Sequence, residues 1–298
     1  MAKCNMCPRE CNANRDQGEI GLCHSPSDFS VAKVMLHKWE EPCLVGEHGA
    51  GTVFFRGCNL GCIFCQNKSI SRNAIGQCIS EGDLEKEIFS LAESGASCIE
   101  FVTPTHYTDK LARLLTKIKP RLDIPIVWNS GGYEKADTLR TLDGLIDIYM
   151  PDFKYFSPEI AKKYSNAPLY RDFALAALHE CVRQVGKPRF NDKGMLEGGV
   201  IVRHLILPSH RADSIAVLEL LAREIGVENI LLSLMGQYTP DFYNELEKEC
   251  GENESFKNLR RRLTSFEYDS VLARATELGF EGYFQSLDSA SKKFTPEF

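Results

Sequence analysis

From about residue 50 onward, short apolar segments alternate with longer segments of helical periodicity, and this alternation restricts the fold of the 298-residue chain more than any other feature. The helical segments carry apolar residues at i, i+3 and i+4, as in Arg211–Ile225. Ser80, and Ser157 followed by Pro158, are residue types that begin helices. Repeated units of this kind predict parallel strands covered by helices. The expected strands are 51–55, 98–102, 125–128, 146–150, 200–207 and 229–234, with a short final strand near 282–285.

Polar turns rich in Gly or Pro follow each of the six longer strands. One such turn is an ordinary solvated loop, but six in succession favour a shared site. In a barrel of parallel strands the carboxyl ends meet at one face, where active sites lie. The predicted fold is therefore α/β, a partial (β/α)6 TIM-like barrel with its site at that face. The turns are 56–58, 103–107, 129–133, 151–154, 208–210 and 236–238.

Cysteine is unevenly distributed along the chain, which has 12 in all. Most fall before residue 80, and no apolar stretch follows Met1 that would indicate a secretory signal. Such clustering in a large chain indicates metal or redox chemistry rather than a disulfide framework. We expect residues 1–50 to form a Cys-rich, loop-rich, metal-binding module and residues 51–298 to form the barrel with a C-terminal helical extension. The scattered Cys98, Cys181 and Cys250 are expected to be small apolar residues.

The composition is that of an ordinary soluble globular protein, with 43% hydrophobic and 26% charged residues. The net charge, 35 − 41 = −6, comes from interspersed acids and bases and disfavours a nucleic-acid partner. No apolar run approaches the ~20 residues that span a bilayer, so no membrane association is expected. We expect a cytoplasmic monomer.

A compact motif, C-x3-C-x2-C, follows the first barrel strand and comprises Cys58, Cys62 and Cys65, here called the loop cysteines. Three thiolates this close together can hold three corners of a [4Fe–4S] cluster and leave the fourth iron without a protein ligand. Gly57 and Gly61 let the backbone wrap closely around such a cluster. Zinc and unliganded structural thiols are the alternatives, but zinc usually takes four ligands in two separated pairs.

A second group, Cys4, Cys7, Cys11 and Cys23, has the spacing C-x2-C-x3-C-x11-C. These N-terminal cysteines suffice for a tetrahedral zinc site or for a second iron–sulfur cluster. The Cys4–Cys7 pair and the Gly21-Leu22-Cys23 turn resemble zinc knuckles, whereas the crowding of Cys7 and Cys11 favours a cluster. Unliganded thiols are the remaining alternative. The segment has few apolar residues from which to build a core, so bound metal would supply folding free energy that it otherwise lacks.

The loop cysteines and several further segments resemble the radical S-adenosylmethionine (AdoMet) superfamily. Within it, the resemblance is to the pyruvate formate-lyase activating enzyme-like branch with a Cys-rich N-terminus, over roughly residues 4 to 285. The segments that carry the resemblance are 37–42, 51–55, 58–67, 103–107, 151–155 and 203–208.

The resemblance also implies which side chains bind AdoMet. The aromatic residue before the last loop cysteine, Phe64, would lie against adenine, and Lys154 of the Asp-x-Lys segment would pair with the carboxylate. Family members usually have Gly-Gly-Glu after the second strand, where this chain has hydroxyl and imidazole side chains instead. The expected AdoMet-binding residues are Phe64, Thr103, Thr105, His106, Asn129, Ser130, Asp152, Lys154 and Gln237.

The activity implied by this resemblance is that of a radical AdoMet oxidoreductase. Such an enzyme reductively cleaves AdoMet at a [4Fe–4S] cluster to a 5′-deoxyadenosyl radical, which abstracts hydrogen from a substrate; a flavodoxin or ferredoxin would supply the electron. The substrate is either a glycyl radical enzyme partner, or a small molecule or another macromolecule. A non-catalytic iron–sulfur or zinc interaction protein is the alternative of a different class. Arg203 and His204 alternate along a strand, so only one of them can face the barrel interior.

Overall fold

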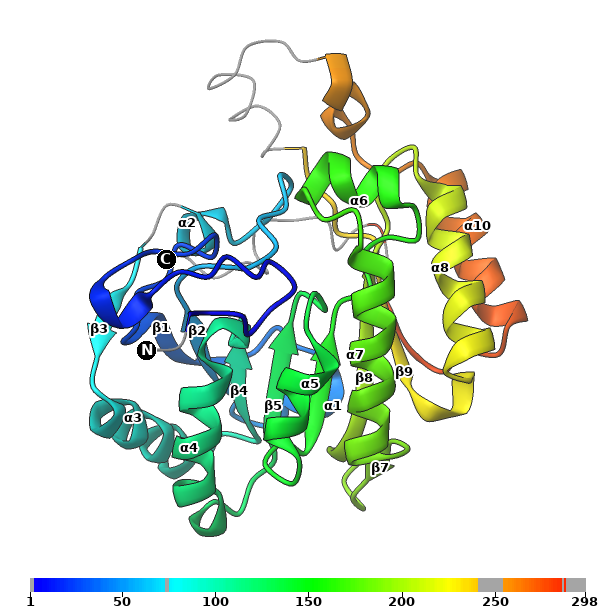
Figure 1. The fold of residues 1–298 in the computed structure, drawn as a ribbon. Helices are drawn as coiled ribbons and strands as arrows, with labels where there is room; N and C mark the ends of the chain where they lie inside the picture. The colour runs from blue at the N-terminus through cyan, green and yellow to red at the C-terminus, as the bar shows by residue number, and fades with distance from the viewer. Residues whose placement is uncertain (1–2, 73–74, 241–253, 286, 288–298) are drawn as a thin grey trace.

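The fold is built around one large sheet, seen in a computed structural model that describes residues 3–72, 75–240, 254–285 and 287. The strand order across the sheet is β10-β9-β8-β6-β5-β4-β2-β1-β3, with β7 paired to β8 (Figure 1). Every pair from β10 to β2 is parallel. The predicted α/β class and the partial barrel of parallel strands are therefore confirmed. Cys250 lies outside the described residues.

The parallel strands coincide with the segments that the sequence predicts, and most of their residues are buried. Apolar runs of four to six residues form fully buried strands because helices cover the outside of the barrel and side chains fill its interior. The parallel strands are β2 (Ala50–Phe55), β4 (Ile99–Val102), β5 (Ile126–Ser130), β6 (Ile148–Pro151), β8 (Leu196–Leu205), β9 (Leu231–Met235) and β10 (Gly282–Phe284).

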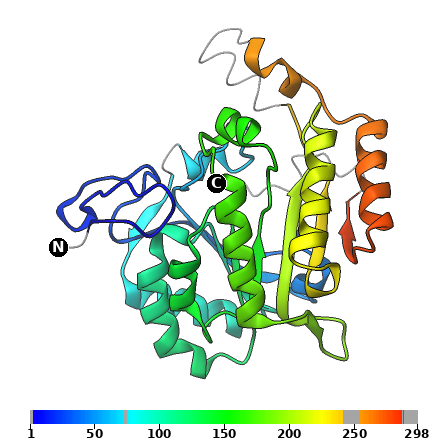
Figure 2. The same ribbon diagram turned by 45° about the vertical axis from the view of Figure 1, so that its right-hand side comes forward.

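The longer helices lie along the outer face of the curved sheet (Figures 1 and 2). Ser80 and Ser157 are N-caps as predicted, because each hydroxyl accepts a backbone N–H from the first turn. None of the helices that the structure describes combines the length and apolar composition needed to cross a bilayer. The α-helices are α1 (Pro42–Val45), α2 (Lys68–Ser71), α3 (Glu81–Glu93), α4 (Thr108–Ile118), α5 (Ala136–Leu139), α6 (Pro158–Ser165), α7 (Tyr170–Val185), α8 (Arg211–Glu224) and α10 (Ser265–Glu277). The 3-10 helices are η1 (Arg15–Gln17), η2 (Thr105–Tyr107), η3 (Lys119–Arg121), η4 (Arg140–Leu142), η5 (Val227–Asn229) and η6 (Glu254–Arg260).

Three antiparallel strands extend the parallel set, and one of them changes the boundary of the N-terminal module. Strand β1 (Phe29–His37) pairs antiparallel with β2, and β3 (Gln77–Ile79) pairs with β1; β7 (Arg189–Phe190) pairs with β8. Residues 29–37 are thus part of the sheet, although the sequence analysis assigns them to the module of residues 1–50. Their β-branched and apolar side chains gain burial by completing the edge beside β2.

Residues 3–28 form the loop-rich part of the chain and pack on one side of the barrel (Figure 2). The Arg9 guanidinium connects this segment to the barrel by donating to the carbonyls of Asn59, Leu60 and Ser165 at 2.7 to 2.9 Å. It also lies over the Tyr133 ring at 5.2 Å from the centroid. These contacts hold residues 3–28 against the loop that carries the loop cysteines.

Candidate active site

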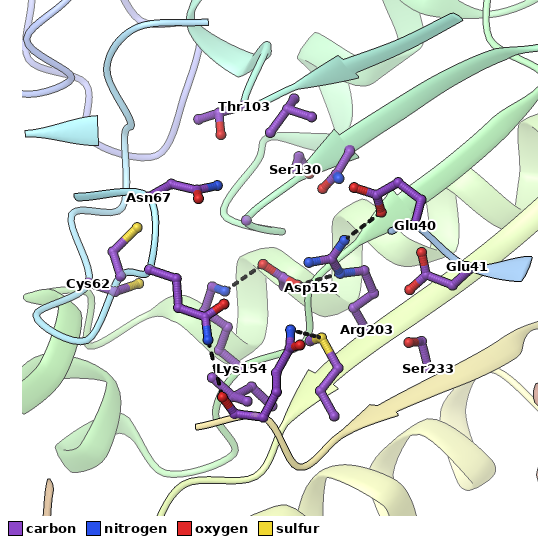
Figure 3. A pocket seen from close by; sticks show the side chains of 18 of the residues that line it. Glu40, Glu41, Cys62, Asn67, Thr103, Ser130, Asp152, Lys154, Arg203 and Ser233 are labelled. Carbon is purple, nitrogen blue, oxygen red and sulfur yellow. Dashed lines mark hydrogen bonds and ion pairs between the residues drawn. The ribbon is translucent and has the colours of Figure 1, made fainter. Parts of the chain in front are cut away.

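A cavity of about 480 Å³ opens at the carboxyl ends of the parallel strands (Figure 3). Its wall includes residues from five of the six turns that the sequence singles out; of the described lining residues, none comes from 208–210. The turns meet here because all six strands point the same way, so their carboxyl ends lie at one face. The cavity is within the range of small-molecule and cofactor sites.

All three loop cysteines line this cavity. Each sulfur accepts a hydrogen bond: Cys58 from the Leu60 N–H at 3.4 Å, Cys62 from the Ser165 hydroxyl at 3.0 Å, and Cys65 from the Ser71 hydroxyl at 3.5 Å. Donors directed at all three sulfurs favour thiolate over thiol. The arrangement therefore suits sulfur ligands of a metal centre.

Without a metal, Cys58 and Cys65 would be neutral thiols. Burial, together with the neighbouring Cys62 and Cys65, raises the pKa of Cys58 to about 12, and burial likewise raises the pKa of Cys65. In the described part of the chain, no three His, Cys, Asp or Glu side chains converge tightly enough to hold a single metal ion. Ligands of a cubic cluster bind different metal atoms and stand farther apart than ligands of one ion. Three neighbouring thiolates from one loop are the ligand set that such a cluster uses.

Gly57 shows how closely residues 3–28 approach the cysteine loop. It adopts φ 87°, and a Cβ there would lie 2.1 Å from the Ser25 Oγ and 2.3 Å from the Cys23 carbonyl oxygen. The Cys58 N–H donates to that same carbonyl at 3.1 Å. Glycine is therefore required at residue 57 by the contact with residues 3–28. This reason is separate from the predicted close approach of the backbone to a cluster.

Asp152 and Lys154 line the cavity beside the loop cysteines and form an ion pair at 2.5 Å. Burial alone would lower the pKa of Lys154, but Asp152 and, when ionised, the sulfurs of Cys62 and Cys65 raise it to about 12. Lys154 is therefore charged at neutral pH. The Tyr170 hydroxyl fixes this segment, since it accepts from the Lys154 N–H at 2.9 Å and donates to the Asp152 carbonyl at 2.8 Å.

Arg203 and His204 occupy opposite faces of β8, and it is Arg203 that faces the cavity. Its guanidinium lies 3.3 Å from Glu40 Oε2 and 3.5 Å from Asp152 Oδ1. His204 is buried on the other face, where its Nδ1 lies 2.6 Å from the Phe153 carbonyl oxygen and burial lowers its pKa to about 4. The choice that the sequence leaves open is settled by this geometry.

Most of the predicted AdoMet-binding residues lie in the cavity wall. Thr103 adopts φ 57°, a conformation in which a β-branched residue is strained and which often marks a functional site. Phe64 is buried with its ring edge-on to Tyr155 and Tyr164. The predicted residues that line the cavity are Phe64, Thr103, Asn129, Ser130, Asp152, Lys154 and Gln237.

Thr105 and His106 are predicted to belong to this set, but neither is among the described residues of the cavity wall. Helix η2 turns their side chains away from the cavity. Thr105 donates to Glu134 Oε1 at 2.9 Å, and His106 Nε2 lies 2.9 Å from the Arg56 carbonyl oxygen. Burial and the nearby Arg15 lower the pKa of His106 to about 3. Through these hydrogen bonds the two residues connect neighbouring loops.

Several acidic residues near the cavity have no predicted role. Glu40 and Glu41 line it and reach it from the segment after β1. Glu100 lies beneath, accepting hydrogen bonds from Asn129 at 2.7 Å and Thr52 at 2.9 Å. Glu134 accepts from Thr105, Trp128 and Ser130, tying together the turns after β4 and β5. The Glu40-Glu41-Pro42 segment is part of the resemblance to the superfamily. The alternation of strand and helix segments in the sequence does not show, however, that an antiparallel strand places this segment at the open end of the barrel.

The N-terminal cysteines gather around Gly21, outside the cavity. A Cβ at Gly21 would lie 2.7 Å from the Cys11 sulfur and 3.9 Å from the Cys23 sulfur. The Cys4 sulfur accepts the Met6 N–H, and the Cys7 sulfur accepts from the Arg9 N–H and the Asn59 side chain. Burial raises the pKa of Cys7 to about 11.

Comparison with known proteins finds a family whose match to this chain contains the cysteine loop. Residues 52–191 match the family described as the Radical SAM superfamily. Over 287 residues the chain is 26% identical to the uncharacterized protein MJ0674 of Methanocaldococcus jannaschii, a match covering 93% of this chain and 75% of that protein. Among solved structures, methylornithine synthase (PylB) is similar with a TM-score of 0.49 and 14% identity, over 78% of this chain and 66% of that one, just under two thirds of its length. The family match includes β2, the loop cysteines and the strands through β6.

Proposed function

We propose that the loop cysteines bind a [4Fe–4S] cluster and that the chain is an enzyme that cleaves AdoMet reductively, in keeping with the match of residues 52–191 to the Radical SAM superfamily. The observation that carries this proposal is that three cysteine sulfurs from one loop line one wall of a cavity of cofactor size. When bound, the cluster and AdoMet supply a 5′-deoxyadenosyl radical that removes a hydrogen atom from the substrate.

The chain's own residues would bind and orient AdoMet. Lys154 carries the positive charge that would pair with the AdoMet carboxylate. The ion pair with Asp152 holds the Lys154 ammonium group in the cavity wall. Phe64 offers an apolar surface beside the loop cysteines. Thr103 and Asn129 add polar groups at the ends of neighbouring strands, within hydrogen-bonding range of a molecule that fills the cavity. Exclusion of water by these side chains protects a reactive species.

At a finer level, we favour the pyruvate formate-lyase activating enzyme-like branch, on the strength of the motifs between residues 37 and 208. The substrate would then be a backbone glycine of a glycyl radical enzyme partner, and a flavodoxin or ferredoxin would donate the electron. A small-molecule substrate is the second candidate, and the presence of buried charged side chains in the cavity wall favours it.

The test of the proposal is anaerobic reconstitution with iron and sulfide, followed by incubation with AdoMet and dithionite. We expect 5′-deoxyadenosine and methionine in equal amounts. A fully iron-loaded protein that forms neither product would instead support the non-catalytic alternative. Addition of a candidate glycyl radical enzyme, with electron paramagnetic resonance of the mixture, then separates the two substrate classes.

We further propose that the N-terminal cysteines hold a second metal centre, either zinc or an iron–sulfur cluster. The Cys4 sulfur accepts a hydrogen bond from the Met6 N–H, and the Cys7 sulfur accepts one from the Arg9 N–H. Hydrogen bonds of this kind stabilise thiolates. Bound metal would draw the four thiols together and supply folding free energy to residues 3–28, a segment with a single short 3-10 helix among its described residues. Metal analysis of the as-purified and reconstituted protein distinguishes zinc from iron.

A further inference from the structure

The cavity has a second end, opposite the cysteines, whose chemistry the proposed function does not use. Figure 3 shows Glu40, Glu41 and Ser233 across the cavity from Cys62 and Asn67, with Asp152, Lys154 and Arg203 between them. We call Glu40, Glu41, His37 and Ser233, which all line the cavity, the carboxylate end.

Negative charge is in excess around this end. Four carboxylates, those of Glu40, Glu41, Glu100 and Asp152, surround the two cations Arg203 and Lys154. Burial and the neighbouring Glu100 raise the pKa of Glu40 well above its usual range, and burial raises that of Glu100. His37 adds no compensating charge, because burial, Arg203 and Lys33 lower its pKa. A buried excess of this kind is costly unless a proton or a cation offsets it.

Polar atoms without partners face the same space. Glu41 is 7% exposed, yet its Oε2 has no hydrogen-bond partner among the described residues. The same is true, within the described structure, of Ser233 Oγ and His37 Nδ1, in side chains that are 1% and 4% exposed. Buried polar groups are nearly always hydrogen-bonded. Three unpartnered atoms at one end of a cavity therefore indicate a polar ligand, and the Glu41 carboxylate oxygen among them calls for a ligand that donates a hydrogen bond.

We propose that the carboxylate end recognises a cationic nitrogen of the substrate, an ammonium or a guanidinium group, with Glu41 as its principal acceptor. Such a group supplies both the positive charge and the N–H donors that this end lacks. The inference rests on the proposed function, since it places the rest of the substrate between this end and the loop cysteines. It extends the proposal by assigning a substrate class, amines and guanidines.

Binding should also release a proton. The raised pKa of Glu40 favours the protonated carboxyl of that residue in the free protein, and an arriving cation favours loss of this proton. Protons and the amine then compete for this end of the cavity. Amine affinity should therefore increase as the pH rises through the pKa of Glu40 and decrease as the pH falls through it. The other titratable groups that face the pair among the described residues include Glu100, Asp152, Arg203, Lys154, His37, Cys43, Cys98 and Tyr283.

The experiment is calorimetric titration of the reconstituted, AdoMet-saturated protein with agmatine, n-butylamine and neutral n-butanol as probes. We expect the two cations to bind at least about tenfold more tightly than n-butanol, and Glu41→Gln to weaken cation binding about 10- to 100-fold while leaving AdoMet affinity unchanged. Glu93→Gln, an exposed residue at the end of α3, is the matched control and should change neither affinity. Titration of the wild type in buffers of different ionisation enthalpy reports proton release without any variant.

Nα-acetyl-lysine methylamide separates the two sources of such a nitrogen. Tighter binding of the free amines supports a small-molecule substrate, and tighter binding of the lysine derivative supports a protein side chain. Equal binding of n-butanol and n-butylamine to the wild type overturns the inference, as does a Glu41→Gln protein that loses AdoMet affinity instead of amine affinity. If wild-type protein still cleaves AdoMet in that case, the proposed function survives; loss of cleavage refutes the proposed function separately.

Discussion

The N-terminal cysteines and the loop cysteines differ in what surrounds their sulfur atoms. All three loop cysteines line the cavity, whereas the described cavity wall includes none of the four N-terminal cysteines. Four thiols can complete a tetrahedral or cubic centre, but three leave one metal coordination position for another ligand. Under the proposed function, the number of cysteines and their access to a cavity would separate a structural metal site from a reactive one, even though the two cysteine groups are packed against each other.

The two regions are connected, which makes the comparison testable. The Cys58 N–H donates to the Cys23 carbonyl, and Asn59 contacts the Cys7 sulfur. Arg9 adds hydrogen bonds to the carbonyls of the cysteine loop. We therefore expect variants of the two regions to have different defects. Variants of the cysteine loop should lose AdoMet cleavage, and variants of residues 3–28 should lose local order.

The largest expected effect is that of Cys62→Ala. Removal of one of three ligands leaves the cluster without a stable site, so AdoMet cleavage should fall below detection, as measured by 5′-deoxyadenosine formation. Cys181→Ala, in a buried thiol of α7 that lies outside the described cavity wall, should retain cleavage. Near-normal cleavage by Cys62→Ala would show that the loop cysteines do not hold the reactive centre.

A second large effect is expected for Cys7→Ala combined with Cys23→Ala. Loss of two ligands should release the N-terminal metal and expose residues 3–28 to proteolysis. Limited digestion followed by mass spectrometry reports the sites of cleavage. Cys98→Ala provides a control in a buried thiol that contacts the Leu44 carbonyl. Equal protease resistance of the double variant and the wild type would mean that no metal stabilises this segment.

A smaller effect is expected for Lys154→Ala, which removes the cation beside the loop cysteines. Loss of one charge-assisted hydrogen bond predicts about 10- to 100-fold weaker AdoMet binding, with unchanged iron content. Equilibrium binding to the reconstituted protein measures this change. Lys86→Ala, an exposed lysine paired with Asp83 on α3, should have no effect. The proposed role fails if Lys154→Ala binds AdoMet as tightly as the wild type does.

The smallest effect is expected for Arg9→Ala, which separates residues 3–28 from the cysteine loop without touching either set of cysteines. Loss of these hydrogen bonds to carbonyl groups should lower the melting temperature by roughly 4–8 °C, if the change costs about 2 kcal/mol. Arg113→Ala, an exposed arginine on α4, is the control. An unchanged melting temperature would mean that the two regions are held together by other contacts.

The sequence predicts the parallel strands well because each is a short apolar run followed by a polar turn, and this pattern depends only on local burial. The sequence does not predict β1. The segment Phe29–His37 lies between cysteines that indicate metal binding, so it is assigned to a loop-rich module rather than to the sheet. Periodicity also cannot show that β1 brings Glu40 and Glu41 to the barrel mouth, because this depends on antiparallel pairing with β2.

The candidate site shows the same division. Asp152 and Lys154 follow a strand directly and lie in the cavity as predicted, because the strand fixes their direction. Thr105 and His106 also follow a strand, but the 3-10 helix η2 rotates them toward Glu134 and Arg56. A local turn of this kind is set by tertiary hydrogen bonds, which a single sequence does not display.

The central claim, that the chain holds two separate metal centres with different roles, is tested most directly by metal and acid-labile sulfide analysis of the reconstituted variants. We predict that Cys62→Ala loses about four irons and four sulfides per chain and keeps the N-terminal metal. The Cys7→Ala and Cys23→Ala double variant should show the reverse, losing only the N-terminal metal. If both variants lost the same metal, or if either kept the full wild-type content, the two cysteine groups would not be separate centres.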